Sequence, residues 1–183
     1  MRDITTIKCW LQMHEEALEK NPDDAYAWFK RGVMLGRLDR FEEALASINR
    51  SLELVPRTPD VPTRPAPSSE DESEWRPESC DEPHWKGAGS HYNSRDVWNE
   101  KADIFEKLGL IEKQLECHRV ITELYPRYSF GWLSRGSLLV RHKRYREALT
   151  CYERAMKIHL FDDFFDEEEC TQGIEECRKH LAT

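Results

Sequence analysis

The stretch GWLSRGSLLVRHKRYREALTCYERAM, residues 131–156, decides the fold. Trp132 is followed by the small residue Gly136 four positions later. Tyr145 and Ala148 come thirteen and sixteen positions after the same tryptophan. Small residues let two antiparallel helices approach closely, because a large side chain at either position would hold the backbones apart. The stretch therefore predicts a pair of packed helices joined by a short turn.

The same spacing occurs twice more in the chain. The corresponding residues are Trp28, Gly32, Phe41 and Ala44 in one copy, and Trp98, Ala102, Ile111 and Gln114 in the other. Trp98 and Trp132 are 34 residues apart, as are Pro22 and Pro56. Proline at the end of a unit stops its second helix, because it cannot donate the next backbone hydrogen bond. A period of 34 residues with two helices per unit predicts a stack of helix pairs.

With these residues the chain resembles the tetratricopeptide repeat family, over residues 25–56 and 94–160. The middle unit departs from the family pattern because Gln114 stands where the family has a packed alanine. The third unit departs because Leu160 replaces the final proline. The resemblance implies an all-α fold, a right-handed α-superhelix (α-solenoid) of about three tetratricopeptide helix pairs. Flanking N- and C-terminal helices and a long inserted loop complete the expected architecture.

We expect a single domain over residues 1–183. Its expected parts are an N-terminal helix or half repeat (1–22), repeat 1 (25–56), an inserted Pro-rich and acidic loop (57–94), repeat 2 (95–126), repeat 3 (129–160) and a C-terminal capping helix (163–183). Trp10 lies where close packing needs a small residue, so the N-terminal helix is either a cap or the remnant of a repeat. In the capping helix, Ile174, Cys177 and Leu181 share the face that we expect to be buried.

The insertion contains the stretch PDVPTRPAPSSEDESEWRPESCDEP, residues 59–83, with six of the nine prolines of the chain. So many prolines exclude another helix pair, and we interpret the segment as a long loop within one domain. Its acidic run indicates solvated disorder. The alternatives are a docking segment or a kinase target at Ser68 or Ser69. Three aromatic residues could be held on this protein or on a partner: Trp75, Trp85 and Tyr92.

The composition narrows the function. The formal net charge of −8 argues against nucleic acid or an anionic membrane as the partner. The sequence has no apolar run of the roughly 18 residues that a membrane span needs, so we expect a cytoplasmic protein. His14 lacks the second histidine of a metalloprotease motif, and no phosphate-binding loop or nucleophile elbow is present, so we expect no enzymatic activity.

Metal and cofactor chemistry also finds no support in the sequence. The six cysteines are scattered without a CxxC pair, and we interpret them as reduced thiols, with those on helices filling core gaps. Cys80, His84 and His91 do not have zinc-finger spacing, and a fourth ligand is not evident. We therefore predict no metal site and no cofactor.

The family resemblance implies that the first helix of each unit lines a concave groove, which binds an extended peptide or a helix of a partner. The residues that the resemblance places in this groove are Tyr26, Phe29, Lys30, Val33 and Arg37 from repeat 1, Asp96, Asn99, Glu100 and Asp103 from repeat 2, and Phe130, Leu133, Ser134, Ser137 and Arg141 from repeat 3. Aromatic residues at the ends and acids in the middle suit a ligand with apolar anchors and a basic residue.

Some relatives hold the C-terminal carboxylate of a chaperone with a clamp of lysine, asparagine and arginine. The clamp positions are occupied here by Phe29, Val33, Glu100, Phe130 and Ser134. We therefore do not expect a chaperone tail as the ligand.

Basic residues concentrate in RHKRYRE, residues 141–147, and form a possible anion patch of Arg141, Lys143, Arg144 and Arg146. One interpretation is that the acidic C-terminal segment neutralises this patch. The alternative is that the protein is an accessory subunit of a larger complex and contacts RNA or phosphate there. The primary prediction is a non-enzymatic scaffold or adaptor that binds another protein in the groove.

Overall fold

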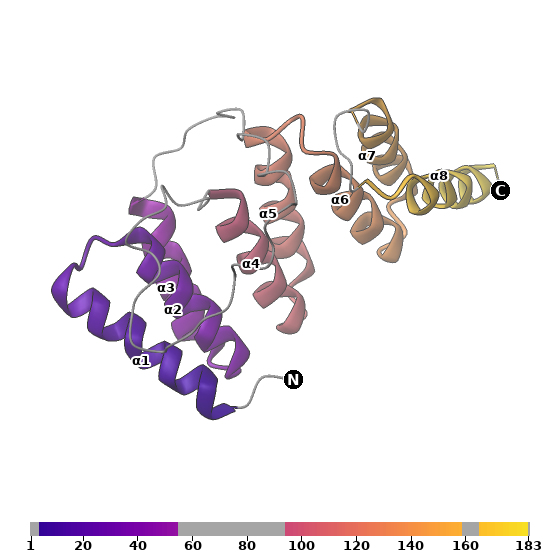
Figure 1. The fold of residues 1–183 in the computed structure, drawn as a ribbon. Helices are drawn as coiled ribbons and strands as arrows, with labels where there is room; N and C mark the ends of the chain where they lie inside the picture. Colours follow the sequence, from indigo (N-terminus) through magenta and orange to yellow (C-terminus); the bar gives the residue numbers. More distant parts are fainter. Residues whose placement is uncertain (1–3, 55–93, 159–164, 183) are drawn as a thin grey trace, which may run out of the picture.

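The computed structural model describes residues 4–54, 94–158 and 165–182, and the secondary structure in these ranges is entirely helical (Figure 1). The helices are α1 (Ile4–Lys20), α2 (Ala25–Arg37), α3 (Phe41–Leu54), α4 (Ser94–Lys107), α5 (Ile111–Leu124), α6 (Ser129–Arg141), α7 (Tyr145–Ile158) and α8 (Glu167–Leu181).

The helices form a stack of pairs. Helices α2 and α3, α4 and α5, and α6 and α7 pack against each other, and α3 contacts α4 as α5 contacts α6. Helix α1 packs on α2 at one end and α8 packs on α7 at the other. The helices follow one another from indigo α1 to yellow α8 (Figure 1). This arrangement confirms the all-α superhelix that the sequence predicts.

The turn inside each pair has the same backbone geometry. Its central residue has a left-handed φ: 59° at Asp39, 67° at Gly109 and 60° at Lys143. The next residue donates its backbone N–H to a carbonyl five positions earlier, in the bonds Arg40 to Leu35 (3.0 Å), Leu110 to Phe105 (2.9 Å) and Arg144 to Leu139 (2.9 Å). This bond occupies a carbonyl that the end of the first helix leaves free. The shared geometry makes the three turns directly comparable.

Small residues set the distance between paired helices. A Cβ added at Gly32 would lie 2.8 Å from Ile48 on α3, and one at Gly136 would lie 2.8 Å from Tyr152 on α7. Ala44 and Ala148 are completely buried on the opposing helices. The sequence pattern of small residues therefore corresponds to two real points of close contact.

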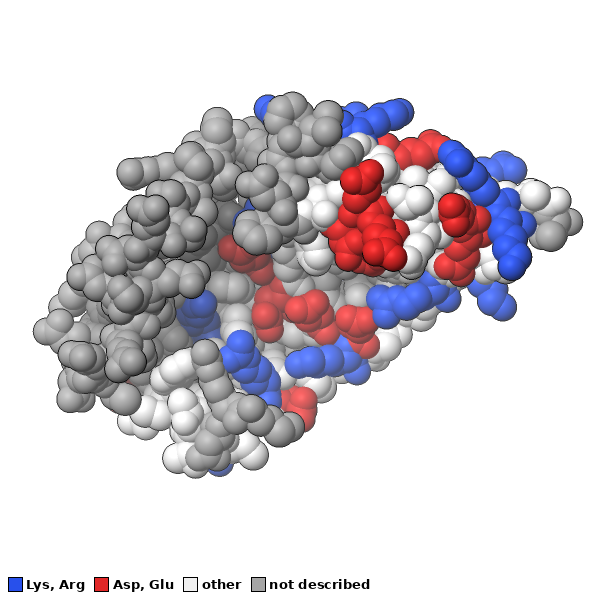
Figure 2. All heavy atoms as spheres, turned by 45° about the vertical axis from the view of Figure 1, so that its right-hand side comes forward, with Lys and Arg blue, Asp and Glu red and all other residues white. Residues whose placement is uncertain are grey.

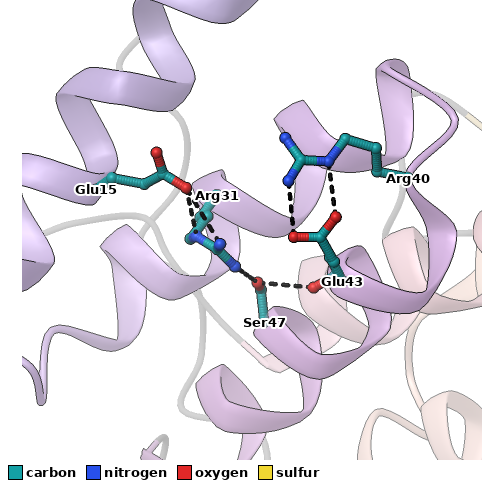
Figure 3. A network of polar contacts seen from close by, with 5 residues as sticks. All are labelled: Glu15, Arg31, Arg40, Glu43 and Ser47. Carbon is teal, nitrogen blue, oxygen red and sulfur yellow. Dashed lines mark hydrogen bonds and ion pairs between the residues drawn. The ribbon is translucent and has the colours of Figure 1, made fainter.

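Helix α1 is attached to repeat 1 by a polar network (Figure 3). Arg31 on α2 forms an ion pair with Glu15 on α1 at 3.1 Å and donates a hydrogen bond of 2.6 Å to Ser47 on α3. Ser47 in turn donates to the backbone carbonyl of Glu43, which pairs with Arg40 at 2.7 Å.

Residues at the position of Arg31 make equivalent bonds in the other repeats. Lys101 donates to Asn49 on α3 at 2.7 Å, and Arg135 donates to Thr122 on α5 at 3.1 Å. In each case the partner lies on the second helix of the preceding unit. Helix α1 therefore occupies the place of a second helix.

The C-terminal helix α8 packs through small residues. Cys170, Gly173 and Cys177 are buried, and Tyr152 lies directly against Gly173. The expected face of Ile174, Cys177 and Leu181 is wrong at Leu181, which is exposed. In the same last turn, His180 stacks on Tyr145 of α7, with the ring centroids 4.3 Å apart, while Leu181 faces solvent.

The described cysteines are free thiols. Cys117, Cys151, Cys170 and Cys177 are buried, as expected for residues that fill core gaps, whereas Cys9 on α1 is exposed. The boundaries expected for the single domain and its inserted loop remain predictions.

Candidate partner-binding groove

The residues predicted to line the groove lie on α2, α4 and α6, the first helices of the three pairs. Three of the apolar residues predicted to line the groove are in the core instead. Phe29 and Val33 belong to a buried cluster that includes Ile7 and Leu11 of α1, and Leu133 is buried in the cluster around α7. The expectation that these three side chains are accessible anchors is therefore corrected. The sequence did not reveal that α1 supplies apolar side chains to the same cluster as α2.

Tyr26 is half-buried at the start of α2. Its ring meets His14 of α1 edge-on, with the ring centroids 6.5 Å apart. The ammonium of Lys30 lies 5.2 Å from the Tyr26 centroid and 5.3 Å from the Phe29 centroid. Burial and the negative charge of Asp24 raise the pKa of the Tyr26 hydroxyl. Helix α1 therefore restricts access to Tyr26.

Phe130 is the accessible aromatic residue of the predicted set, with half of its surface exposed. Its ring lies 5.9 Å from that of Tyr128, and the guanidinium of Arg95 on α4 lies 4.6 Å from the Tyr128 ring. Arg95 and Tyr128 were not among the predicted site residues. Their contact shows that the N-terminal ends of α4 and α6 are adjacent.

Helix α4 carries the acidic residues. Asp103 is exposed, and Asp96, Asn99 and Glu100 are partly buried. Burial raises the pKa of the Glu100 carboxyl, and the charge of Asp103 raises it further. Burial likewise raises the pKa of Asp103, with a contribution from the charge of Glu106. Neither Glu100 nor Asp103 forms an ion pair within 4.0 Å in the described part of the chain, whereas Asp96 pairs with Arg95 at 3.4 Å.

Cations from α2 lie near these carboxyl groups without direct contact. Burial lowers the pKa of Lys30, as does the charge of Arg37, and the charges of Asp96 and Glu100 oppose this change. Lys107 donates to the backbone carbonyl of Gly36 at 3.4 Å. The negative charge on α4 is therefore only partly compensated from within the protein.

Helix α6 contributes polar side chains that already form hydrogen bonds or ion pairs within the protein. Ser137 donates to Glu169 of α8 at 2.9 Å and accepts a bond of 3.3 Å from the Tyr152 hydroxyl. Arg141 pairs with Glu106 of α4 at 2.8 Å, and Ser134 is partly buried. Figure 2 shows acidic and basic side chains intermixed on one face of the described helices. The involvement of Glu106 and Glu169 was missed, because both depend on contacts between units.

The possible anion patch is partly neutralised. Besides the pair of Arg141 with Glu106, Arg144 pairs with Glu147 at 2.7 Å and with Glu112 at 3.7 Å. These acids come from α4, α5 and α7. In the described part of the chain, the acids that compensate Arg141 and Arg144 therefore come from neighbouring helices, whereas one interpretation of the sequence assigned this role to the C-terminal segment. Lys143 and Arg146 are exposed.

The remaining predictions from the sequence concern metal binding, the insertion and membrane spans. In residues 4–54, 94–158 and 165–182, no group of three or more metal-ligating side chains comes together. Cys80, His84 and His91, like the phosphorylation and docking predictions for the insertion, lie outside the described residues. None of the described helices is long and apolar enough to cross a membrane.

The fold and the repeated helix contacts define a tetratricopeptide repeat architecture, and comparison with known proteins agrees. A family model described as "Tetratricopeptide repeat" matches residues 15–46, from α1 into α3. No curated protein matches the chain in sequence. Residues 15–46 therefore match the tetratricopeptide repeat family, and the described helices have the tetratricopeptide repeat fold.

Several solved structures share this fold at low sequence identity. A crystal structure of MamA protein has a TM-score of 0.61 and 10% identity, and the match covers 94% of this chain and 72% of that one. YrrB, described as a TPR protein with an unusual peptide-binding site, has a TM-score of 0.54 and 11% identity over 98% of this chain and 80% of that one. The first TPR of Spaghetti (RPAP3), bound to an HSP90 peptide, has a TM-score of 0.54 and 13% identity. The match covers 87% of this chain and 94% of that one.

Proposed function

We propose that this protein is a non-enzymatic interaction scaffold that binds a peptide or helix of a partner protein across α2, α4 and α6. The observation that carries the proposal is the pair Glu100 and Asp103. Both carboxyl groups are partly desolvated, and neither has a cation in direct contact in the described part of the chain. A basic side chain from a partner would compensate this partly desolvated negative charge.

Structural neighbours support the general mode of binding. The Spaghetti domain was solved with a bound peptide, and YrrB is described as having a peptide-binding site. The charge of the ligand is inferred from this chain alone. Because Glu100 occupies a position of the carboxylate clamp, we propose a basic ligand in place of an acidic chaperone tail.

Phe130 is the proposed apolar anchor. Its exposed ring lies beside Tyr128, at the end of α6 nearest Arg95. Aromatic residues in such positions commonly contribute about 2 kcal/mol or more to binding. The partner segment would place an apolar side chain on Phe130 and a lysine or arginine on α4.

Selection from short random peptides displayed on phage tests the proposal with the full chain as bait. Enriched peptides should contain lysine or arginine and should bind more weakly as salt increases. Glu100→Gln with Asp103→Asn should weaken them about tenfold or more, and Phe130→Ala should do the same. The matched control, Glu42→Gln with Glu175→Gln, removes two exposed charges on α3 and α8 and should leave binding unchanged. Equal binding by all variants would show that the peptides bind at a surface other than α4 and α6.

The alternative of RNA or phosphate binding at the basic turn has less support. Arg141 and Arg144 are engaged with acids, and Glu112 adds negative charge beside them. A protein ligand in the groove requires no disruption of these pairs.

A further inference from the structure

The turn between α4 and α5 exposes apolar side chains. Leu108, Leu110 and Ile111 have 40%, 39% and 37% of their surface exposed. Leu110 and Ile111 line a hollow together with Lys113, and the turn between α6 and α7 closes its other side with His142 and Arg144. We call Leu110, Ile111, Lys113, His142 and Arg144 the turn-edge surface.

The equivalent turns in the other two repeats show that the fold does not need an apolar residue at position 110. Arg40 and Arg144 occupy this position in repeats 1 and 3. Each forms an ion pair of 2.7 Å with a glutamate three residues later, Glu43 or Glu147. In repeat 2, Leu110 and Lys113 replace the arginine and the glutamate. An exposed leucine therefore stands where the same backbone elsewhere carries a charged pair.

The residue that starts the second helix is also left uncovered in repeat 2. Phe41 packs against a core cluster, and the ammonium of Lys107 lies 5.9 Å from its ring. Tyr145 stacks on His180 of α8, with the centroids 4.3 Å apart. Ile111 occupies the same position and remains exposed. On the next first helix, α6, the side chain of Arg141 is directed to Glu106, with which it forms an ion pair.

The lining of the hollow contains more cations than acids. Lys113 and Arg144 line it, and Lys143 and Arg146 follow in the adjacent turn. Arg144 is paired with Glu147 at 2.7 Å and with Glu112 at 3.7 Å, so Lys113 is the cation of the lining that forms no ion pair in the described part of the chain. The acid in the lining is Glu112, which contacts Arg144 at 3.7 Å and has 85% of its side chain exposed. A ligand with carboxylates would therefore complement the rim, while an apolar side chain would fill the hollow.

We propose that the turn-edge surface is a second docking site, separate from the groove, for a segment of a partner protein that presents an apolar side chain beside aspartate or glutamate. The site goes beyond the proposed function of the groove and does not depend on it. The apolar lining favours a protein segment over RNA, because phosphate contacts would use the cations and leave Leu110 and Ile111 exposed to water.

A charge-pair transplant provides the test. Leu110→Arg with Lys113→Glu installs in repeat 2 the pair found in repeats 1 and 3, so the fold should be retained. Short random peptides displayed on phage are selected on the wild-type full chain and assayed on this variant. A class of peptides with an apolar residue next to aspartate or glutamate should bind at least about tenfold more weakly to the variant. The same peptides should bind Glu100→Gln with Asp103→Asn as tightly as wild type.

Leu110→Ser is the second variant and removes the apolar side chain without adding charge. It should weaken the same peptides, with an unchanged circular dichroism spectrum. The proposal is overturned if no acidic-apolar class is enriched, or if these peptides bind both variants as tightly as wild type. It is equally overturned if a uridine oligonucleotide displaces the peptides and binds with an affinity that Leu110→Ser does not change. Dimerisation that Leu110→Ser abolishes, measured by light scattering, would assign the surface to a second copy of this chain instead.

Discussion

The middle repeat differs from its two neighbours along the inner side of its second helix. The buried or partly buried positions there are Ala44, Ile48 and Leu52 on α3, Ala148, Tyr152 and Met156 on α7, but Gln114, His118 and Thr122 on α5. At these three positions repeats 1 and 3 carry apolar or aromatic side chains and repeat 2 carries polar ones, although repeat 2 also buries apolar residues such as Leu115 and Ile121. The backbone of the three turns is nevertheless the same.

The difference teaches that repeat geometry and repeat stability have separate origins. The three pairs share the turn geometry and a small residue at positions 32, 102 and 136. The stability of a pair depends on what fills it, because burial of apolar surface is the main favourable term. The Thr122 hydroxyl donates a hydrogen bond to the backbone carbonyl of Arg119 and accepts one from the side chain of Arg135. Nδ1 of His118 is buried and makes no hydrogen bond in the described part of the chain.

In repeat 2, apolar and polar groups have exchanged places relative to repeats 1 and 3. Polar residues lie inside the helix pair, while Leu110 and Ile111 lie exposed at its turn. Local departures from the pattern that best supports a fold are expected at functional sites. The acids of α4 belong to this repeat, as do Leu110, Ile111 and Lys113 of the turn-edge surface.

Exchanging the equivalent residues Ile48 of repeat 1 and His118 of repeat 2 should have the largest effect on the free energy of unfolding. Ile48→His removes apolar contacts beside Gly32 and buries an imidazole, and should lower the free energy of unfolding by about 3–5 kcal/mol. His118→Ile removes the unpartnered Nδ1 and should raise it by about 1 kcal/mol. Urea denaturation followed by circular dichroism measures both. Equal and opposite effects of less than about 1 kcal/mol would contradict the distinction between the two repeats.

The pH dependence of stability should be the second largest effect. Burial lowers the pKa of His118 to about 4, with the nearby charges of Arg135 and Arg141 acting in the same direction and that of Glu106 opposing them. The unfolded chain therefore binds more protons than the folded one between about pH 6.5 and pH 4. Stability should be constant above this window and should fall within it as the pH is lowered, by at most about 3 kcal/mol.

The difference between wild type and His118→Ile isolates this contribution. Glu100 and Asp103 have raised pKa values, so their protonation stabilises the folded state at low pH and acts in the opposite direction. Both proteins share those carboxyl groups. Thermal unfolding at a series of pH values should show the loss between pH 6.5 and 4 in wild type and its reduction in the variant. Parallel curves would show that His118 is solvated or hydrogen-bonded.

The sequence was sufficient to predict the helix pairs, because spacing between Trp132, Gly136 and Ala148 reports local packing directly. It did not predict which first-helix residues remain accessible. Phe29 and Phe130 both look like exposed aromatic anchors in sequence, but α1 contributes to the cluster that buries Phe29, and Phe130 remains open. Accessibility depends on contacts between units, for which no short motif exists. The same reason explains why the pair of Arg141 with Glu106 was missed.

The exposed apolar turn was overlooked for a different reason. In the sequence, Ile111 is the large apolar residue that corresponds to Phe41 and Tyr145, and the pattern does not distinguish its exposure from theirs. Packing at that position depends on a cover from the next unit, supplied by Lys107 for Phe41 and by His180 for Tyr145. Conformity to a repeat pattern therefore does not establish burial.

The smallest predicted effects come from placing leucine at equivalent positions of repeats 3 and 2. Ala148 is completely buried against the first helix of its pair, so Ala148→Leu should overpack it and cost about 1–3 kcal/mol. Gln114 already fills the same position with a side chain of about leucine's size, so Gln114→Leu should cost less than about 1 kcal/mol or be stabilising. Urea denaturation of the two variants measures the contrast, with retained helicity as the control. An unchanged stability in Ala148→Leu would mean that the repeat register is wrong. A large loss in Gln114→Leu would mean that the amide of Gln114 makes a polar contact on which the middle repeat depends, and polar filling would then stabilise that repeat.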